Sequence, residues 1–174
     1  MAGADPRTRL WVMMETPLAI LNAGEIAGAD QRLACLVLGT NDLVKETRAR
    51  SSGSSFALVP MLTNCVLAAR AFGLDVIDGV FNDFKNEDGF RAECEQGRDL
   101  GMDGKTLIHP GQIATCNAIF APSTEEISWS RKVIAAFVEP SNASKGVITI
   151  DGKMVERLHL AMAERVVAIA AAVA

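Results

Sequence analysis

This sequence predicts an α/β fold built on a parallel sheet, and three of its features lead to that prediction. Continuous apolar runs of strand length recur along the chain, as in strands that are buried on both faces. Segments whose apolar residues have helical spacing lie between these runs. Glycine and acidic residues follow the runs, where turns are expected. Four such strand–helix units in series favour a parallel sheet with right-handed crossovers.

Four units fit two architectures, and the pattern alone does not choose between them. An open doubly wound sheet usually has more strands. A (β/α)8 barrel has eight strands and takes about 250 residues, so four units would form half of it. The chain has 174 residues, 49% of them hydrophobic and 22% charged, which is typical of one ordinary globular domain.

The composition argues against several classes of function. The formal net charge is −4, so no basic surface for nucleic acid is expected. No apolar run has the length of a membrane span and no signal peptide is apparent, so we expect a cytoplasmic protein without membrane partners. The four cysteines are widely spaced and form no CxxC pair, which favours reduced and mostly buried thiols.

The first strand–helix–strand unit has clear boundaries. Leu10–Met14 is an apolar run of strand length, and Thr16 and Pro17 follow as the expected N-cap and first helical residue. Apolar residues on one face predict a helix that continues to Gly28. The second buried strand is Leu33–Leu38, and a loop is expected to follow it up to position 43.

The next units repeat this pattern. A mobile loop or linker is expected over residues 45–55, where charged residues give way to serine and glycine. The elements predicted after it are a helix over 57–72, a strand over 74–77, a helix over 90–100, a strand over 105–108 and helices over 112–120 and about 123–138.

The last part of the chain has a different pattern. Asp151 and Gly152 lie between two short β-type runs, which indicates a hairpin turn. A final helix is predicted over about 155–173. We therefore expect the βα units, which form a partial barrel if the second architecture holds, over residues 1–138 and a C-terminal extension over residues 139–174.

Two acidic residues follow the first two predicted strands. Glu15 comes directly after the first strand, and Asp42 comes four residues after the second. The carboxyl ends of parallel strands meet at one edge of a sheet, so both carboxylates are expected at that edge. Carboxylate oxygens suit a hard divalent cation such as Mg²⁺. The alternative is two surface acids that are favoured by the dipoles of nearby helices.

Other residues with possible roles also have purely structural interpretations. Lys105 fits a solvated lysine at a strand start, and His109 with Pro110 fits a rigid turn that leads into a helix. The GKT segment at 104–106 resembles the end of a phosphate-binding loop, but that motif needs a glycine where Asp99 stands. No dinucleotide-binding glycine motif, zinc-protease motif or serine-hydrolase elbow occurs.

Five motifs resemble, in order and spacing, the citrate lyase beta-subunit family of acyl-CoA lyases in the HpcH/HpaI aldolase superfamily. They are MMETPLAILNAGEIA, LGTNDL, VIDGVFNDFKNEDGF, LGMDGKTLIHPGQI and IDGKMVERLHLA. The resemblance covers nearly the whole chain from Leu10 onward. It implies the C-terminal half, strands five to eight, of a TIM (β/α)8 barrel. An extension would follow and pack on a neighbouring subunit of a homotrimer or homohexamer.

The resemblance also implies roles for individual residues. Glu15 and Asp42 match the family's two Mg²⁺-binding carboxylates. Asp151 matches a catalytic acid that reaches the active site of a neighbouring subunit. The residues whose backbone would hold a carboxylate of the oxoacid substrate are Gly39, Thr40 and Asn41. The residues implied near the coenzyme A moiety are Lys105, Ile108, His109 and Pro110.

The activity implied by the resemblance is Mg²⁺-dependent cleavage of a 3-hydroxyacyl-CoA, of the malyl-, citramalyl- or citryl-CoA type, into an acyl-CoA and a 2-oxoacid. A thioesterase of the same family would hydrolyse malyl-CoA at the same metal site. An aldolase that acts on a pyruvate enolate would use two carboxylates and a metal without coenzyme A. The family's early acidic motif and substrate-binding arginine have no match here, so a non-catalytic partner is a further alternative.

Overall fold

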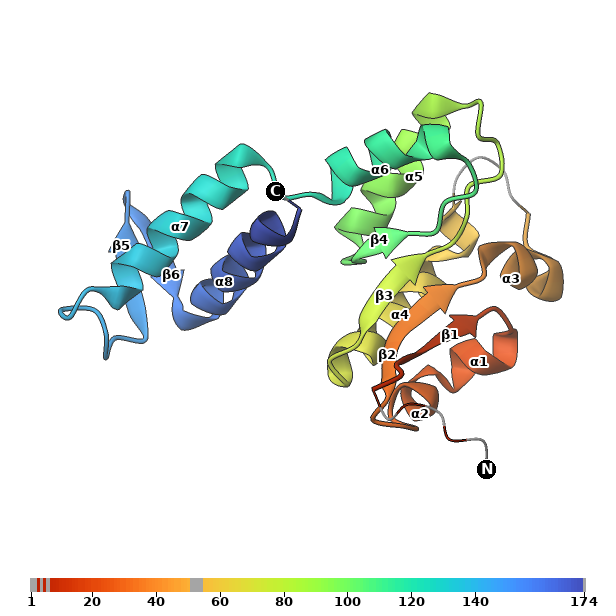
Figure 1. Cartoon of the computed structure of the whole chain (residues 1–174), viewed down its shortest axis with the longest axis horizontal. Coiled ribbons are helices and arrows are strands. Elements are labelled where there is room, and N and C mark those ends of the chain that lie inside the picture. Colours follow the sequence, from red (N-terminus) through yellow and green to blue (C-terminus); the bar gives the residue numbers. More distant parts are fainter. Residues whose placement is uncertain (1–2, 4, 6, 51–54, 174) are drawn as a thin grey trace. The chain divides into compact units, whose positions relative to one another are not determined.

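The chain forms two compact units, Met1–Phe120 and Ala121–Ala174, in a computed structural model that describes residues 3, 5, 7–50 and 55–173 (Figure 1). The first unit is an α/β unit built on a four-stranded sheet, and the second combines two helices with a hairpin. Among the described residues, no helix has both the length and the apolar character to cross a bilayer.

The sheet of the first unit is parallel, with the strands in the order β1-β2-β3-β4. The strands are β1 (Leu10–Met14), β2 (Leu33–Leu38), β3 (Asp75–Asp78) and β4 (Gly104–Lys105). The α-helices are α1 (Pro17–Leu21), α2 (Ala23–Ala27), α3 (Thr40–Thr47), α4 (Val59–Ala71), α5 (Glu87–Asp99) and α6 (Ile113–Phe120). Two 3-10 turns complete the unit, η1 (Ser55–Ala57) and η2 (Pro110–Gln112). The predicted series of parallel βα units is confirmed. The sheet is open over the described residues, and half of a barrel stays a prediction.

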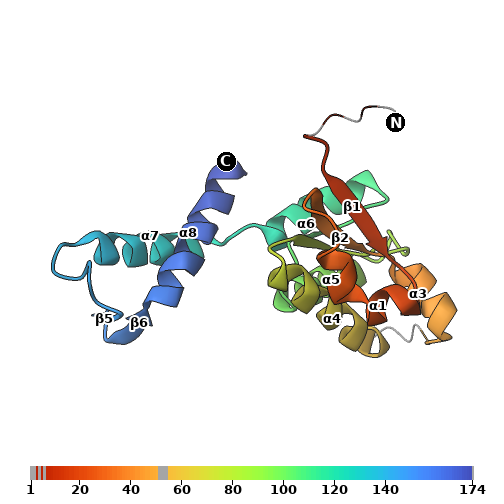
Figure 2. The ribbon, with the colours of Figure 1, turned by 90° about the horizontal axis from the view of Figure 1, so that it is seen from below.

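One face of this sheet is covered by helices. Val12, Leu36 and Val76 pair across three strands, and Leu36 and Val76 are fully buried in the core that α1, α2 and α4 complete. Figure 2 shows α1 and α4 on the same side of β1 and β2. Side chains alternate between the faces of a strand, and Trp11 and Met13, which point the other way on β1, are more than half exposed.

The first helix of the unit begins where the sequence predicts and ends earlier. The Thr16 hydroxyl accepts a hydrogen bond from the Ala19 N–H at 3.1 Å, and Pro17 is the first helical residue. The predicted helix up to Gly28 is in fact two helices, α1 and α2. Asn22 separates them, because its ψ of 20° does not continue an α-helix.

Two segments after strands differ from the predictions. The loop expected up to position 43 is helical from Thr40, where α3 begins with Gly39 as its N-cap. The strand predicted over 105–108 stops at Lys105, because the Gln112 side chain accepts the N–H groups of Ile108 and His109 at 3.1 and 3.2 Å. Of the loop predicted over 45–55, residues 45–47 belong to α3 and residues 51–54 lie outside the described residues.

The second unit contains α7 (Thr124–Val138), β5 (Val147–Ile150), β6 (Lys153–Glu156) and α8 (Arg157–Ala172). The predicted hairpin is present as the antiparallel pair β5 and β6. Val133 and Phe137 of α7 share a buried core with Val155 and with Ala163 of α8. The predicted boundary lay after residue 138, whereas α7 lies in the second unit, because its apolar face packs in this core.

Candidate functional site

The carboxyl ends of the four parallel strands meet at one edge of the sheet, which we call the rim. The rim consists of residues 15–16, 39–42, 78–82 and 105–110, which follow or end the four strands. Glu15 and Asp42, the two carboxylates predicted at a shared edge, both belong to it. Parallel strands bring to the rim residues that are far apart in the sequence.

Glu15 lies directly against the start of the next segment of the rim. A Cβ atom added to Gly39 would be 2.3 Å from the Glu15 Cβ and 2.9 Å from its Oε2. The Gly39 N–H donates a hydrogen bond to the Met14 carbonyl at 3.1 Å. A side chain at position 39 would therefore displace Glu15, so Gly39 permits the half-buried position of this carboxylate.

Asp42 is exposed in the first turn of α3. The N–H groups of a first helical turn have no partner within the helix, and the helix dipole favours anions there. Thr40 and Asn41 contribute such groups, whereas the Gly39 N–H is occupied by Met14. Of the three residues predicted to hold a substrate carboxylate through their backbone, Thr40 and Asn41 thus offer the donors.

The donor set of Glu15 and Asp42 fits Mg²⁺. In the part of the chain that the structure describes, no ion pair reaches either carboxylate. The described residues also contain no group of three or more His, Cys, Asp or Glu side chains arranged to hold a metal. Mg²⁺ is commonly bound by one or two carboxylates, with water and substrate oxygens completing its octahedron. Two carboxylates are therefore enough.

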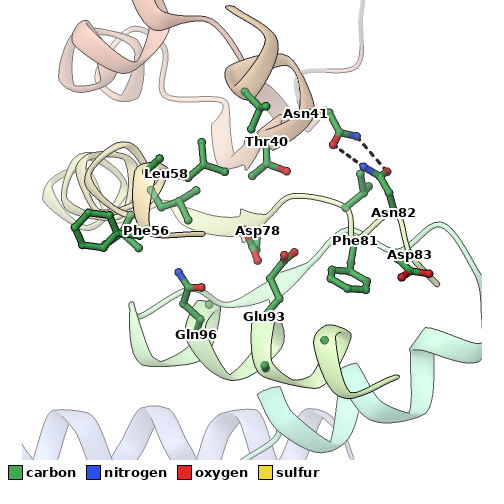
Figure 3. A pocket seen from close by; sticks show the side chains of 18 of the residues that line it. Thr40, Asn41, Phe56, Leu58, Asp78, Phe81, Asn82, Asp83, Glu93 and Gln96 are labelled. Carbon is green, nitrogen blue, oxygen red and sulfur yellow. Dashed lines mark hydrogen bonds between the residues drawn. The ribbon is translucent and has the colours of Figure 1, made fainter. Parts of the chain in front are cut away.

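A cavity of about 740 Å³ lies beside this part of the rim (Figure 3). Thr40 and Asn41 line one side, and Asp78 and Glu93 line another. Its apolar lining includes Phe56, Leu58 and Phe81. The volume is in the range of small-molecule sites. Glu15 and Asp42 are not among its lining residues, but Thr40 and Asn41, which precede Asp42, are. The cavity therefore lies next to the candidate metal site and does not contain it.

Lys105 forms a buried ion cluster with two acids, and the alternative of a solvated lysine is wrong. Its ammonium is fully buried and donates to Asp78 Oδ2 at 2.7 Å and to Glu93 Oε1 at 2.5 Å. The Asp78 carboxylate also accepts the Gly79 N–H at 2.8 Å. The ammonium is thus committed inside the protein, and this geometry does not present it to a coenzyme A phosphate.

Burial and charge act in opposite directions in this cluster. Burial raises the pKa of the Glu93 carboxyl, and the Lys105 ammonium offsets that rise only in part. Burial lowers the pKa of Lys105, but the carboxylates of Asp78 and Glu93 outweigh it, so the pKa of the lysine is raised overall. The lysine therefore stays charged at neutral pH. Asp78 and Glu93 were not among the functional residues predicted from the sequence, although the acid that ends the apolar run of β3 was an available signal.

The other residues predicted near coenzyme A form a rigid, exposed turn. The His109 ring stacks on Phe84, with ring centroids 4.7 Å apart, and its Nδ1 accepts the Gly111 N–H at 3.1 Å. Pro110 is the first residue of η2. Ile108, His109 and Pro110 are all exposed. The structural interpretation of His109 and Pro110 as a fixed turn is confirmed, and contact with coenzyme A stays a prediction.

Asp151 lies at the tip of the β5–β6 hairpin in the second unit. Its φ of 50° and the φ of 75° at Gly152 are typical of a type I′ turn, as the sequence predicts. Its carboxylate forms an ion pair with Lys132 of α7, and both side chains are more than half exposed. A catalytic role for Asp151 stays a prediction.

Comparisons with known proteins agree with this fold. The sequence pattern described as HpcH/HpaI aldolase/citrate lyase matches residues 2–110. A (3S)-malyl-CoA thioesterase of Cereibacter sphaeroides (strain ATCC 17025) is 53% identical over 99% of this chain and 60% of its own length. Citrate lyase subunit beta of Escherichia coli (strain K12) is 36% identical over 88% of this chain and 51% of its own length. The chain thus spans 60% or less of the length of these curated relatives.

Two solved structures have folds similar to that of this chain. The protein CitE from Mycobacterium tuberculosis, in complex with magnesium, acetoacetate and coenzyme A, matches 94% of this chain and 60% of its own, with a TM-score of 0.74 and 28% identity. A citrate lyase from Burkholderia xenovorans matches 95% of this chain and 53% of its own, with a TM-score of 0.79 and 19% identity. The second similarity shows the fold alone.

Proposed function

We propose that this chain, which belongs to the HpcH/HpaI aldolase/citrate lyase family, hydrolyses a 3-hydroxyacyl-CoA thioester of the (3S)-malyl-CoA type with Mg²⁺. The observation that carries the proposal is its 53% identity, over almost the entire chain, to a (3S)-malyl-CoA thioesterase. The motifs of the sequence favoured a carbon–carbon lyase, with hydrolysis as the alternative. The comparison favours hydrolysis, because the citrate lyase subunits are more distant at 36% identity.

Glu15 and Asp42 are the residues that would hold the metal ion. Bound there, Mg²⁺ would supply a Lewis acid that polarises substrate oxygens. The half-buried Glu15 is fixed against Gly39, while Asp42 projects from the first turn of α3. The N–H groups of Thr40 and Asn41 at that helix start would bind a substrate carboxylate, since helix N-termini favour anions. Substrate would thus be held by two carboxylates through the metal and by backbone donors.

The exposed turn formed by Ile108, His109 and Pro110 would lie along the coenzyme A moiety. This proposal is supported by the position of the turn on the rim and by its exposed apolar and aromatic surface. Lys105 would contribute indirectly, because its ammonium is committed to Asp78 and Glu93. A solved relative was crystallised with coenzyme A, which agrees with a coenzyme A ligand for this family.

Hydrolysis and carbon–carbon cleavage differ in the bond that breaks, and cleavage also needs a proton donor for carbon. Hydrolysis breaks the bond between the carbonyl carbon and sulfur, and water yields malate and free coenzyme A. Cleavage of malyl-CoA breaks a carbon–carbon bond and gives acetyl-CoA and glyoxylate; the substrate hydroxyl gives up its proton to a base, and a proton donor is required at the new methyl group. Asp151 from a neighbouring subunit of a homotrimer or homohexamer is the donor we propose for that second candidate, which the citrate lyase relatives favour.

Product analysis on the full chain tests the proposal. We would incubate the protein with (3S)-malyl-CoA and Mg²⁺, and measure free thiol, malate and glyoxylate. Thiol and malate in equal amounts, without glyoxylate, are expected. Glyoxylate and acetyl-CoA without free thiol would replace hydrolysis by the lyase reaction. No product, together with Mg²⁺ binding that Glu15→Gln abolishes, would favour the non-catalytic partner.

A further inference from the structure

Two neighbouring segments of the rim interlock, and we propose that Gly79 and Asn82, after β3, are positioning residues for the start of α3. This inference rests on the proposed function, in which that helix start carries Asp42 and the backbone donors of Thr40 and Asn41. Neither Gly79 nor Asn82 has a role in that function. Both belong to the segment of residues 78–82 that leaves the sheet beside α3.

Gly79 lies directly against the side chain of Thr40. A Cβ atom added to Gly79 would be 2.3 Å from Thr40 Oγ1, 2.7 Å from Thr40 Cγ2 and 2.9 Å from the Leu38 carbonyl oxygen. Gly79 does not have a positive φ, unlike Gly73, Gly101 and Gly152, so backbone conformation does not require glycine there. The requirement is the close approach of Thr40, the first residue of α3.

Asn82 forms hydrogen bonds with the second residue of the same helix, Asn41. Its Nδ2 donates to Asn41 Oδ1 at 2.7 Å, and Asn41 Nδ2 donates to Asn82 Oδ1 at 3.2 Å (Figure 3). Each amide thus acts as donor and acceptor for the other, across 41 positions of sequence. Two hydrogen bonds between planar amides restrict the orientation of both side chains more than a single bond does.

The supporting segment is itself anchored to the protein interior. The Gly79 N–H donates to Asp78 Oδ1 at 2.8 Å, and Asp78 is held by the buried Lys105 ammonium. The Phe81 carbonyl accepts a hydrogen bond from the Gln112 amide at 3.0 Å. A fixed segment can therefore transmit its position to α3.

The contacts repeat along the rim in one direction. Glu15, after β1, rests on Gly39 after β2, and Thr40, after β2, rests on Gly79 after β3. Each of these segments is thus positioned by close packing against the next one. A metal site shared by Glu15 and Asp42 needs this positioning, because displacement of a reacting group by about 1 Å can cost on the order of 100-fold in rate.

Five variants of the full chain, four single and one double, test the inference. Gly79→Ala and Asn82→Ala remove the two supports. Gly24→Ala, where an added Cβ meets no atom within 4 Å, and Asn117→Ala, on the exposed face of α6, are the matched controls. The readouts are the Mg²⁺ concentration for half-maximal turnover and the hydrogen exchange of the Leu43 N–H, which donates to Gly39 O in the first turn of α3.

We expect Gly79→Ala and Asn82→Ala to raise the Mg²⁺ requirement roughly tenfold, as loss of outer-shell support does. Leu43 exchange should accelerate in both variants, while the controls stay close to wild type. The melting temperature should stay close to wild type in Asn82→Ala and fall in Gly79→Ala, because the added Cβ also meets the Leu38 carbonyl oxygen. Thr40→Ala, which removes the two atoms nearest to position 79, should restore part of the Mg²⁺ affinity in the Gly79→Ala background.

Failure of this inference is separable from failure of the proposed function. A wild-type chain that turns over no malyl-CoA would refute the function, and Leu43 exchange would still decide the positioning. Leu43 exchange that matches the control variants would overturn the role of the residue concerned. If wild type is active, a variant whose Mg²⁺ requirement stays within twofold of the wild-type value would also overturn the role of its residue. A fall in melting temperature alone, with an unchanged Mg²⁺ requirement, would also overturn it by showing a purely structural role.

Discussion

Two pairs of acids lie at or next to the rim in opposite electrostatic situations. Asp78 and Glu93 are bridged by the fully buried ammonium of Lys105. Glu15 is half-buried and Asp42 is exposed, and no ion pair of the described residues reaches either carboxylate. Charges that leave water need a partner inside the protein, whereas charges at the surface do not. The first pair therefore has an internal cation, and the second remains available for an external one.

This difference separates stability from function at the same edge of the sheet. Removal of the internal cation should strongly destabilise the fold, because two carboxylates would remain with little access to water. Removal of an open carboxylate should leave the fold intact and abolish metal binding. The predictions below test that separation, from the largest effect to the smallest.

Lys105→Met is expected to have the largest effect on folding. It leaves Asp78 buried and Glu93 partly buried without a cation, so the free energy of unfolding should fall by about 3–5 kcal/mol. Urea denaturation measures this change. A loss below about 1 kcal/mol would mean that the cluster behaves as a surface ion pair and would remove the contrast.

Glu15→Gln should affect activity and leave stability nearly unchanged. Loss of one of two metal-binding carboxylates should reduce turnover by about 100-fold or more, since the Lewis acid is lost. Titration calorimetry measures the Mg²⁺ affinity, and the urea midpoint measures the stability. Glu25→Gln, on α2, is the control. Wild-type Mg²⁺ affinity in Glu15→Gln would refute the metal site.

The internal cation also acts on a neighbouring thiol. A hydrogen bond from Cys94, together with the charge of the Lys105 ammonium, outweighs burial and lowers the pKa of Cys116 to about 7, whereas burial raises the pKa of Cys65 to about 11. At pH 8 the thiolate of Cys116 should predominate, so iodoacetamide should modify it roughly tenfold faster than Cys65. Mass spectrometry of the alkylated peptides measures both rates. Faster reaction of Cys65 would contradict this order.

Glu93 should make stability depend on pH in a defined direction. Its pKa is raised above the ordinary value of 4.5 in the folded state, so folding favours its protonated form. This contribution is complete below pH 4.5 and is lost as the pH rises through the raised folded pKa. Relative to Glu93→Gln, wild type should therefore lose stability from acid to neutral pH. Denaturation curves of both proteins across that interval would show the opposite slope if the sign were wrong.

Lys132→Ala should have the smallest effect. Its ion pair with Asp151 is more than half exposed on both sides, and exposed pairs contribute about 0.5 kcal/mol or less. A loss in the free energy of unfolding comparable to that of Lys105→Met would show that exposure does not govern these pairs. Asp151→Asn, measured for glyoxylate formation, separately tests the proposed lyase role of the carboxylate.

Signals contained within a few residues predicted much of the fold. Thr16 with Pro17 marked the start of α1, and Asp151 with Gly152 marked the hairpin turn. The apolar runs located β1 and β2 at their observed bounds. The position of Glu15 and Asp42 at one edge followed from the parallel order of the strands, which needs no knowledge of packing.

Signals that depend on distant residues were missed. The strand predicted over 105–108 is short because Gln112 accepts the N–H groups that would pair with a neighbouring strand. The reciprocal pairing of Asn41 with Asn82 spans 41 positions and has no local signature. The grouping of α7 with the second unit depends on which apolar faces share a core.

The sequence by itself determined the parallel βα units, the caps and turns, and the pair of acids at the rim, because adjacent residues set these features through propensity and strand direction. The tertiary structure alone decided which acids would be neutralised from within. Lys105 meets Glu93 and Asp78 across 12 and 27 positions, and only the packing of α5 over the end of β3 brings these charges together away from water.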